Sequence, residues 1–118
     1  MPRGSAGAGI VAGVVTPAEI ERCARVLADA AASPARVMMF GSYARGSAGE
    51  HSDLDFLVIE QHVESRVGES VRLREALPPL DVPVDVIVVS EEQAARRSQV
   101  KGSMVAAALA EGRVLAES

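Results

Sequence analysis

Two aspartates lie close to a glycine–serine pair in the stretch GSYARGSAGEHSDLD, residues 41–55. Asp53 and Asp55 open an apolar run, and side chains two residues apart on a strand point to the same face. Two adjacent carboxylates repel each other, and hard oxygen ligands at this spacing suit Mg²⁺. A D-x-D pair alone is more often an exposed strand edge, but Gly41 and Ser42 upstream favour a metal site. We therefore predict Asp53 and Asp55 as metal ligands.

Gly41 and Ser42 follow a predicted strand and precede a predicted turn or short helix. Such a turn offers backbone N–H groups and a hydroxyl to anionic oxygens. Glycine lacks a Cβ, so a phosphate can approach the backbone closely. Arg45 lies one turn further on, where it could contact a phosphate or the sugar, or only add surface charge. This segment is predicted to bind phosphate.

A third acid is expected from the apolar run that contains Asp85. A lone carboxylate among β-branched residues is costly unless it has a partner. If this strand neighbours the one that Asp53 and Asp55 open, Asp85 completes a carboxylate triad that holds the metal and helps to deprotonate an acceptor hydroxyl. Asp81 competes for the role, but it lies in a proline-flanked turn, and we favour Asp85.

Together these residues resemble the nucleotidyltransferase superfamily of the DNA polymerase β type, and most of all its minimal branch, often called MNT. That branch carries a strand, Gly-Ser, a ten-residue spacer, D-x-D and a third carboxylate on a later strand. The residues that match are Gly41, Ser42, Asp53, Asp55 and Asp85, and the resemblance spans about residues 17–115. Arg45 and Ser52 also match, which implies that they bind the nucleotide.

The resemblance implies a function as well as a fold. Minimal members commonly act as the antitoxin of a HEPN-type RNase toxin, and some transfer AMP from ATP to a tyrosine of that toxin. It thus implies a Mg²⁺-dependent nucleotidyltransferase with two Mg²⁺, ATP as donor and a HEPN-type toxin as partner. Two alternatives stay open: an inactive antitoxin that binds and occludes its partner, and a nucleotidyltransferase acting on a small molecule.

The elements expected around these residues form an α/β (α+β) fold, with a small mixed sheet and helices packed against it. Thr16, Pro17 and Glu19 predict a capped helix start. Strands are expected over residues 36–40, 54–60 and 84–89, with a possible terminal strand at 114–115. Helices are expected over residues 64–77 and 99–111, and another helix is expected to start at Ser90. On the helix at 64–77, the inner side is expected to carry Val63, Val67, Val71 and Leu77. Residues 1–15 are predicted as a flexible segment and 16–118 as one domain.

Composition restricts the partners of this 118-residue chain. Its net charge is −4 and its aromatic content is 3%, so a long nucleic acid is a poor candidate partner. The single cysteine, Cys23, indicates a core residue and no internal disulfide. No apolar run reaches the ~18–20 residues of a membrane span. We expect a cytoplasmic protein that forms a homo- or hetero-oligomer.

Overall fold

The computed structural model describes residues 15–45 and 53–118. Their order along the chain is helix, strand, helix, strand, helix, strand, two helices and a final strand. The elements are α1 (Pro17–Ala30), β2 (Ala35–Phe40), α2 (Ser42–Arg45), β3 (Leu54–Glu60), α3 (Arg66–Ala76), β4 (Val84–Ser90), α4 (Glu91–Arg97), α5 (Met104–Glu111) and β5 (Arg113–Glu117). The predicted segment 1–15, except Val15, lies outside the described residues.

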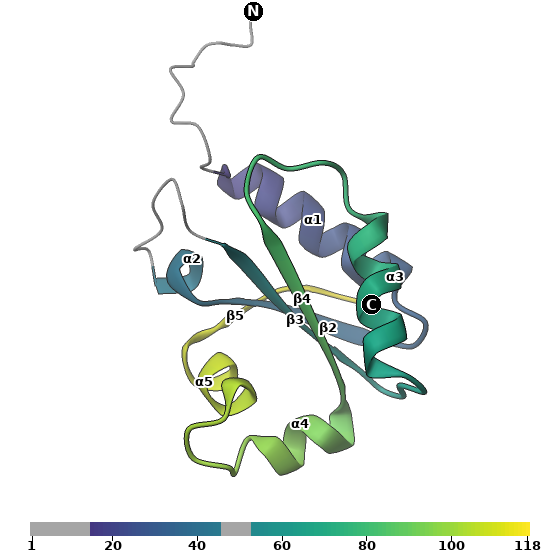
Figure 1. Cartoon of the computed structure of the whole chain (residues 1–118), viewed down its shortest axis with the longest axis vertical. Helices are drawn as coiled ribbons and strands as arrows, with labels where there is room; N and C mark the ends of the chain where they lie inside the picture. Colours follow the sequence, from purple (N-terminus) through teal and green to yellow (C-terminus); the bar gives the residue numbers. More distant parts are fainter. Residues whose placement is uncertain (1–14, 46–52) are drawn as a thin grey trace, which may run out of the picture.

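A four-stranded mixed sheet in the order β4-β3-β2-β5 forms the centre of the fold. β2 pairs antiparallel with β3 and β5, whereas β3 and β4 are parallel. A parallel pair needs a crossover connection, and α3 provides it between β3 and β4. Figure 1 shows α1 and α3 on one side of these strands and α4 and α5 on the other. The predicted mixed sheet with packed helices is confirmed.

Alternation along the strands divides the apolar side chains between two cores. One side of the sheet packs against α1 and α3 through residues such as Val37, Phe56 and Val86. The other side packs against α4 and α5 through Met38 and Leu57 among others. We call these the α1/α3 side and the α4/α5 side. Because side chains two apart share a side, each strand position can be assigned to one of them.

Helix α1 begins as the sequence predicts. Thr16 Oγ1 accepts from the Glu19 backbone N–H, and the Glu19 side chain accepts from the Thr16 N–H, so the capping box is complete. The buried stripe of α1 recurs at helical spacing and includes Cys23, which is 0% exposed. Burial raises the pKa of the Cys23 thiol, as expected for a core residue.

Helix α3 differs from its prediction. Val67 and Val71 were expected to face inward, but their exposed fractions are 76% and 52%. Leu73 is the buried side chain of this helix instead, because α3 lies rotated so that it packs Leu73 against the α1/α3 side of the sheet. Val63 and Leu77 are only half-buried. Short stretches with few apolar residues define a helical face poorly, which explains the error.

The last helix begins later than predicted. Residues 99–103 form turns, and α5 starts at Met104 with Ser103 as its N-cap. Gly112 ends it as the C-cap with φ −80°. A Cβ at Gly112 would lie 2.4 Å from the Ala108 carbonyl oxygen and 2.8 Å from that of Met39. The glycine is therefore needed for close packing of α5 against β2.

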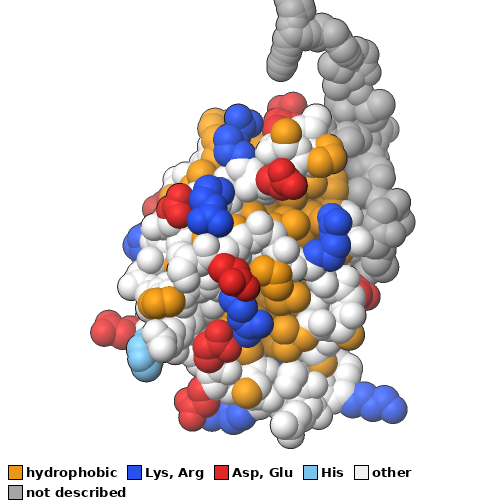
Figure 2. Space-filling model, turned by 180° about the vertical axis from the view of Figure 1, so that it is seen from behind, with side chains coloured by type: hydrophobic (Ala, Val, Ile, Leu, Met, Phe, Trp, Pro, Cys, Tyr) orange, Lys and Arg blue, Asp and Glu red, His pale blue; other side chains and the backbone are white. Residues whose placement is uncertain are grey.

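Apolar side chains also reach the surface between charged ones, as Figure 2 shows for the side opposite to the view of Figure 1. Large exposed apolar side chains are Val67, Val71, Val100, Met104 and Val114. Among the described residues, no helix combines the length and hydrophobicity required to cross a bilayer.

Candidate active site

The acidic residues meet where β3 and β4 begin. Asp53 directly precedes β3, and Asp55 is the second residue of that strand. Parallel pairing of β3 with β4 puts Asp55 opposite Asp85. Register partners in a parallel pair share a side of the sheet, so Asp55 and Asp85 both lie on the α4/α5 side. The condition on which the predicted triad depended, that the two strands are neighbours, is met.

Buried neighbours fix the direction of these carboxylates. Leu54 and Phe56 flank Asp55 and are both 0% exposed within the core of the α1/α3 side. Because side chains alternate along a strand, Asp55 must then point to the other side. The Leu54 N–H donates to the Pro83 carbonyl at 2.9 Å, which holds the entry of β3 against the residue before β4. The same alternation applies to Asp85 between Val84 and Val86.

Crowding of like charges marks the site electrostatically. Asp55 is half-buried, while Asp53 and Asp85 are exposed. Burial, and then the negative charges of Asp85 and Asp53, raise the pKa of Asp55 to about 6. The carboxylates of Asp53 and Asp85 therefore lie close enough to oppose the ionisation of Asp55. Asp81, the competing acid, lies exposed in the turn before β4, and the charges acting on Asp55 come from the other two.

Gly41 lies in direct contact range of this cluster. It has φ +80°, a conformation that favours glycine, and a Cβ there would lie 2.5 Å from Asp55 Oδ2. The antiparallel pairing of Phe40 with Asp55 brings the end of β2 to this position. The predicted approach of the glycine–serine turn to the aspartates is thus observed for Gly41.

Helix α2 follows Gly41 and carries Ser42 and Arg45. Tyr43 anchors it, because its ring packs against the core of the α1/α3 side and its hydroxyl accepts from the Val15 N–H at 3.4 Å. The side chains of Ser42 and Arg45, and the whole of Ser52, lie outside the described residues. Their roles as nucleotide contacts remain predictions.

The sequence interpretation missed two apolar neighbours of the acids. Phe40 is the register partner of Asp55, and Ile87 lies two residues after Asp85, so both share the acids' side of the sheet. Both are partly buried and pack against the core of the α4/α5 side. The period of two along each strand was the signal that could have located them beside the carboxylates.

Magnesium fits the acids only in combination with a phosphate ligand. The described residues contain no group of three or more His, Cys, Asp or Glu side chains arranged to hold a metal ion. Mg²⁺, however, usually binds one or two carboxylates and completes its shell with substrate phosphates and water. Like-charged Asp53, Asp55 and Asp85, with Gly41 directly against Asp55, suit that mode of binding. A triphosphate would supply the missing oxygens.

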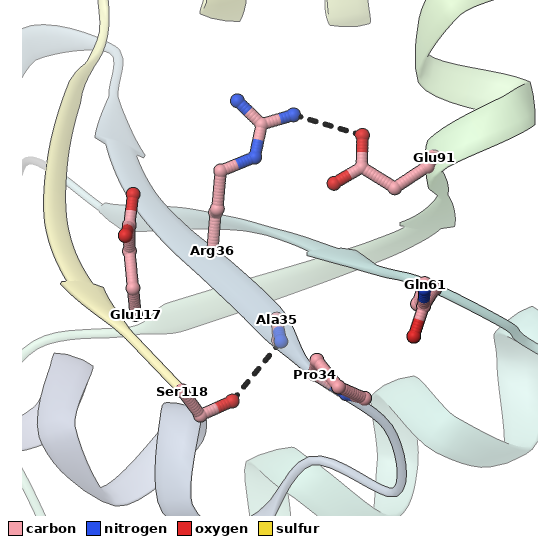
Figure 3. A pocket seen from close by; sticks show the side chains of 7 residues that line it. All are labelled: Pro34, Ala35, Arg36, Gln61, Glu91, Glu117 and Ser118. Carbon is pink, nitrogen blue, oxygen red and sulfur yellow. Dashed lines mark hydrogen bonds and ion pairs between the residues drawn. The ribbon is translucent and has the colours of Figure 1, made fainter.

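A second pocket, of about 510 Å³, lies at the other end of β2 (Figure 3). Its guanidinium group, on Arg36, forms an ion pair with Glu91 at 3.0 Å. The Ser118 hydroxyl accepts from the Ala35 N–H at 3.0 Å. These polar groups bind one another across the pocket, and none of them has the environment of a nucleophile or base. We therefore do not regard it as a competing active site.

Another carboxylate cluster lies at the far end of β3. Glu60 is 0% exposed, and Ser33 Oγ donates to it at 3.4 Å. Burial and the neighbouring Glu69 raise the pKa of Glu60 to about 7. Arg72 donates to both Glu69 oxygens, at 2.9 and 2.8 Å, and Ala32 N–H donates at 3.0 Å. The Arg72 bonds are the main reason that the pKa of Glu69 falls to about 2.

Sequence comparison agrees with the geometry of the aspartate site. The model of the nucleotidyltransferase domain family matches residues 20–107, which is most of the chain and includes Gly41, Asp53, Asp55 and Asp85. The chain belongs to the nucleotidyltransferase domain family. No curated protein sequence shows significant similarity to the chain.

Solved structures support the same fold for this nucleotidyltransferase domain. A putative nucleotidyltransferase from Sulfolobus solfataricus is 22% identical with a TM-score of 0.56, over 82% of this chain and 76% of that one. A toxin–antitoxin structure with AMP-PNP is 21% identical with a TM-score of 0.55, over 86% and 73%. A mutant of the toxin–antitoxin MntA-HpeT is 23% identical with a TM-score of 0.50, over 86% and 72%. At these identities the likeness concerns the fold.

Proposed function

We propose that this nucleotidyltransferase domain transfers AMP from ATP to a hydroxyl group in a Mg²⁺-dependent reaction. The observation that carries the proposal is the register of β3 and β4, which sets Asp85 beside Asp55 on one side of the sheet. Gly41 at the adjoining end of β2 lies directly against Asp55, since a Cβ there would be 2.5 Å from Asp55 Oδ2, so the glycine–serine turn begins next to this carboxylate. Carboxylates together with a phosphate-binding turn are what phosphoryl-group chemistry requires.

The residues divide the work as follows. Asp53, Asp55 and Asp85 would hold two Mg²⁺, which neutralise charge on the phosphates when bound. Gly41, Ser42, Arg45 and Ser52 would hold the triphosphate and sugar. The acceptor oxygen attacks the α-phosphorus, the bond from that phosphorus to the bridging oxygen breaks, and pyrophosphate leaves. Asp85 would take the proton of the acceptor hydroxyl.

For the biological role, we propose an antitoxin that modifies a tyrosine of a HEPN-type toxin. Support comes from two of the similar structures, which are toxin–antitoxin proteins, one of them with the ATP analogue AMP-PNP. The resemblance to the minimal branch of the superfamily points the same way. An acidic chain with few aromatics is also better suited to a protein acceptor than to a long nucleic acid.

Transfer of label tests this proposal. The purified chain is incubated with Mg²⁺, ATP labelled at the α-phosphate and the protein encoded beside it, and we expect label on that protein. ATP labelled at the γ-phosphate is the control and should leave it unlabelled, since a kinase would give the opposite pattern. Asp53→Asn and Asp55→Asn should both abolish transfer. Retained transfer in both variants would refute the site, and absence of transfer by the parent would favour an occluding antitoxin.

A further inference from the structure

The order of the strands determines from which side an acceptor can approach. Gly41, where the phosphates are proposed to bind, lies at the end of β2, Asp55 lies on the central β3, and Asp85 lies on β4. In an in-line displacement the attacking oxygen and the leaving pyrophosphate lie on opposite sides of the phosphorus. With pyrophosphate on the β2 side, the acceptor hydroxyl must enter from the β4 side. This step rests on the proposed function.

An apolar groove occupies that side of the molecule. It has a volume of about 270 Å³ and lies between Val67, Ser70 and Val71 of α3 and residues 86–88 of β4. It begins one residue after Asp85 in the chain but opens toward α3, on the α1/α3 side of β4, whereas Asp85 points to the α4/α5 side. A docked partner would therefore reach Asp85 around the edge of β4, which is an outer strand. Val67 and Val71 are separated by four residues, so they share a face of α3, and they are 76% and 52% exposed. Apolar side chains so exposed beside a groove are typical of a protein-binding surface.

The edge of β4 decides what kind of contact the groove accepts. β4 is an outer strand of the sheet, and such a strand usually offers backbone groups to another strand. Here the Ser70 hydroxyl donates to the Val86 carbonyl, so that position is already occupied. The Ser70 hydroxyl thus competes with a partner strand for the Val86 carbonyl, whereas side chains can still enter between Val67 and Val71 of α3 and the adjoining β4. The groove is thus suited to side-chain insertion.

The positive charge of Arg66 at the edge of the groove restricts the kind of partner that can bind there. Arg66 lines the groove beside Val67. An acidic residue next to the inserted apolar side chains of a partner would complement this guanidinium. We propose that the α3–β4 groove docks the acceptor protein through a segment of aliphatic or aromatic side chains flanked by an acidic one, from which the acceptor hydroxyl reaches Asp85 around the edge of β4.

A matched pair of variants tests the docking surface. In Val67→Asp/Val71→Asp the groove acquires two charges at exposed positions, and the control Val114→Asp places the same change at a 46% exposed valine on β5, the opposite edge of the sheet. The probe is the protein encoded beside this chain, and its Kd is measured calorimetrically without nucleotide. We expect the groove variant to bind at least about tenfold more weakly and the control to bind as the parent does.

Further measurements separate this proposal from the catalytic one. Val67→Leu/Val71→Leu should retain binding, and circular dichroism should show that every variant is folded. Equal binding by parent and groove variant, or no binding by the parent, overturns the docking surface. If the groove variant binds weakly while the parent transfers no AMP, docking is supported and the proposed transfer fails. If Asp55→Asn binds as the parent does but transfers nothing, both proposals are supported.

Discussion

The two ends of β3 each gather carboxylates, but their surroundings differ. At the start, Asp55 lies among other negative charges, and its pKa rises to about 6 through burial and through Asp85 and Asp53. At the far end of β3, Glu60 lies beside Glu69, and Arg72 donates a hydrogen bond to each carboxylate oxygen of Glu69. The far end thus compensates its charges with protein groups, while the near end leaves three acids facing solvent.

Protonation completes the far cluster. Glu60 Oε2 is buried and accepts no hydrogen bond from any described group. With its pKa raised to about 7, the Glu60 carboxyl can be protonated and can then donate a hydrogen bond to the adjacent Glu69 carboxylate. An internally satisfied pair of this kind stabilises the fold. The group of acids at the start of β3 lacks such partners and is instead suited to an external cation. This difference separates a candidate binding site at one end of β3 from a structural cluster at the other.

The strongest test of this difference is one carboxyl-to-amide change at each end of the strand. Asp55→Asn should lower AMP transfer by about a thousandfold or more, because a ligand for the metal and triphosphate is lost. Its Tm should equal or exceed that of the parent, since like-charge repulsion is removed. Glu60→Gln should retain transfer. Comparable loss in both variants, measured with labelled ATP, would erase the distinction between the ends.

A glycine pair tests how closely the turn must approach the near end. Gly41→Ala should lower transfer by about 10- to 100-fold, because its Cβ would displace Asp55, in addition to straining a left-handed φ. Gly102 is the control, since it has φ +86° and a Cβ added to it would meet no other atom within 4 Å. Gly102→Ala therefore carries the strain alone and should leave kcat unchanged. Equal kcat losses would assign the effect to backbone strain.

The pH dependence of stability tests protonation at the far end. Glu60 has an ordinary pKa of 4.5, which it regains on unfolding, and a folded value of about 7. Between these values the native state binds more protons, so the free energy of unfolding should fall as pH rises from about 4.5 to about 7, by about 1–3 kcal/mol from this group. Glu60→Gln should flatten that fall in urea titrations. A parallel course for parent and variant would show that Glu60 ionises normally.

The smallest expected effect concerns the arginine that compensates the far end. Arg72→Met should lower the free energy of unfolding by about 1–2 kcal/mol, because Glu69 and the Ala30 carbonyl lose a donor. Arg25→Met is the control, since it removes an ion pair with Asp29 that is exposed at both side chains and an exposed bond to the Glu117 carbonyl. Together these should contribute less than about 0.5 kcal/mol. Chemical denaturation measures both. Similar losses would mean that the far cluster is no more than surface charge.

Much of the near end could be predicted from the sequence, because local rules decide it. Alternation along β3 fixed the side of Asp53 and Asp55, and the apolar run around Asp85 marked a buried strand. That β3 and β4 are neighbours depends on the crossover through α3, which the sequence left as a condition. The identity of the acids and of Gly41 could therefore be predicted from local sequence patterns. Their proximity in space depends on how the strands pair in the sheet.

The far end could not be predicted in the same way. In the sequence, Glu69 and Arg72 have the i,i+3 spacing of an ion pair on a solvated helix face, and the structure does contain that ion pair. The Glu69 side chain, however, is only 11% exposed, because the turn after α1 and the end of β3 close over it. One of the groups that bind it, the Ala32 N–H, lies 37 positions away in the sequence. The inward assignment of Val67 and Val71 failed for the same reason, since α3 is oriented by tertiary contacts.

The pairing of Asp55 with Asp85 is maintained by sheet hydrogen bonds, and the length of the connecting chain does not enter into it. Additional residues at the exposed turn Pro78–Pro79 would lengthen the connection without moving either strand. A single residue inserted inside β4 between Val84 and Asp85 would instead turn that carboxylate to the α1/α3 side. Tolerance to insertion should thus change abruptly within a few positions. The loop accepts extra residues, whereas one extra residue in the strand moves the following side chains to the other side of the sheet.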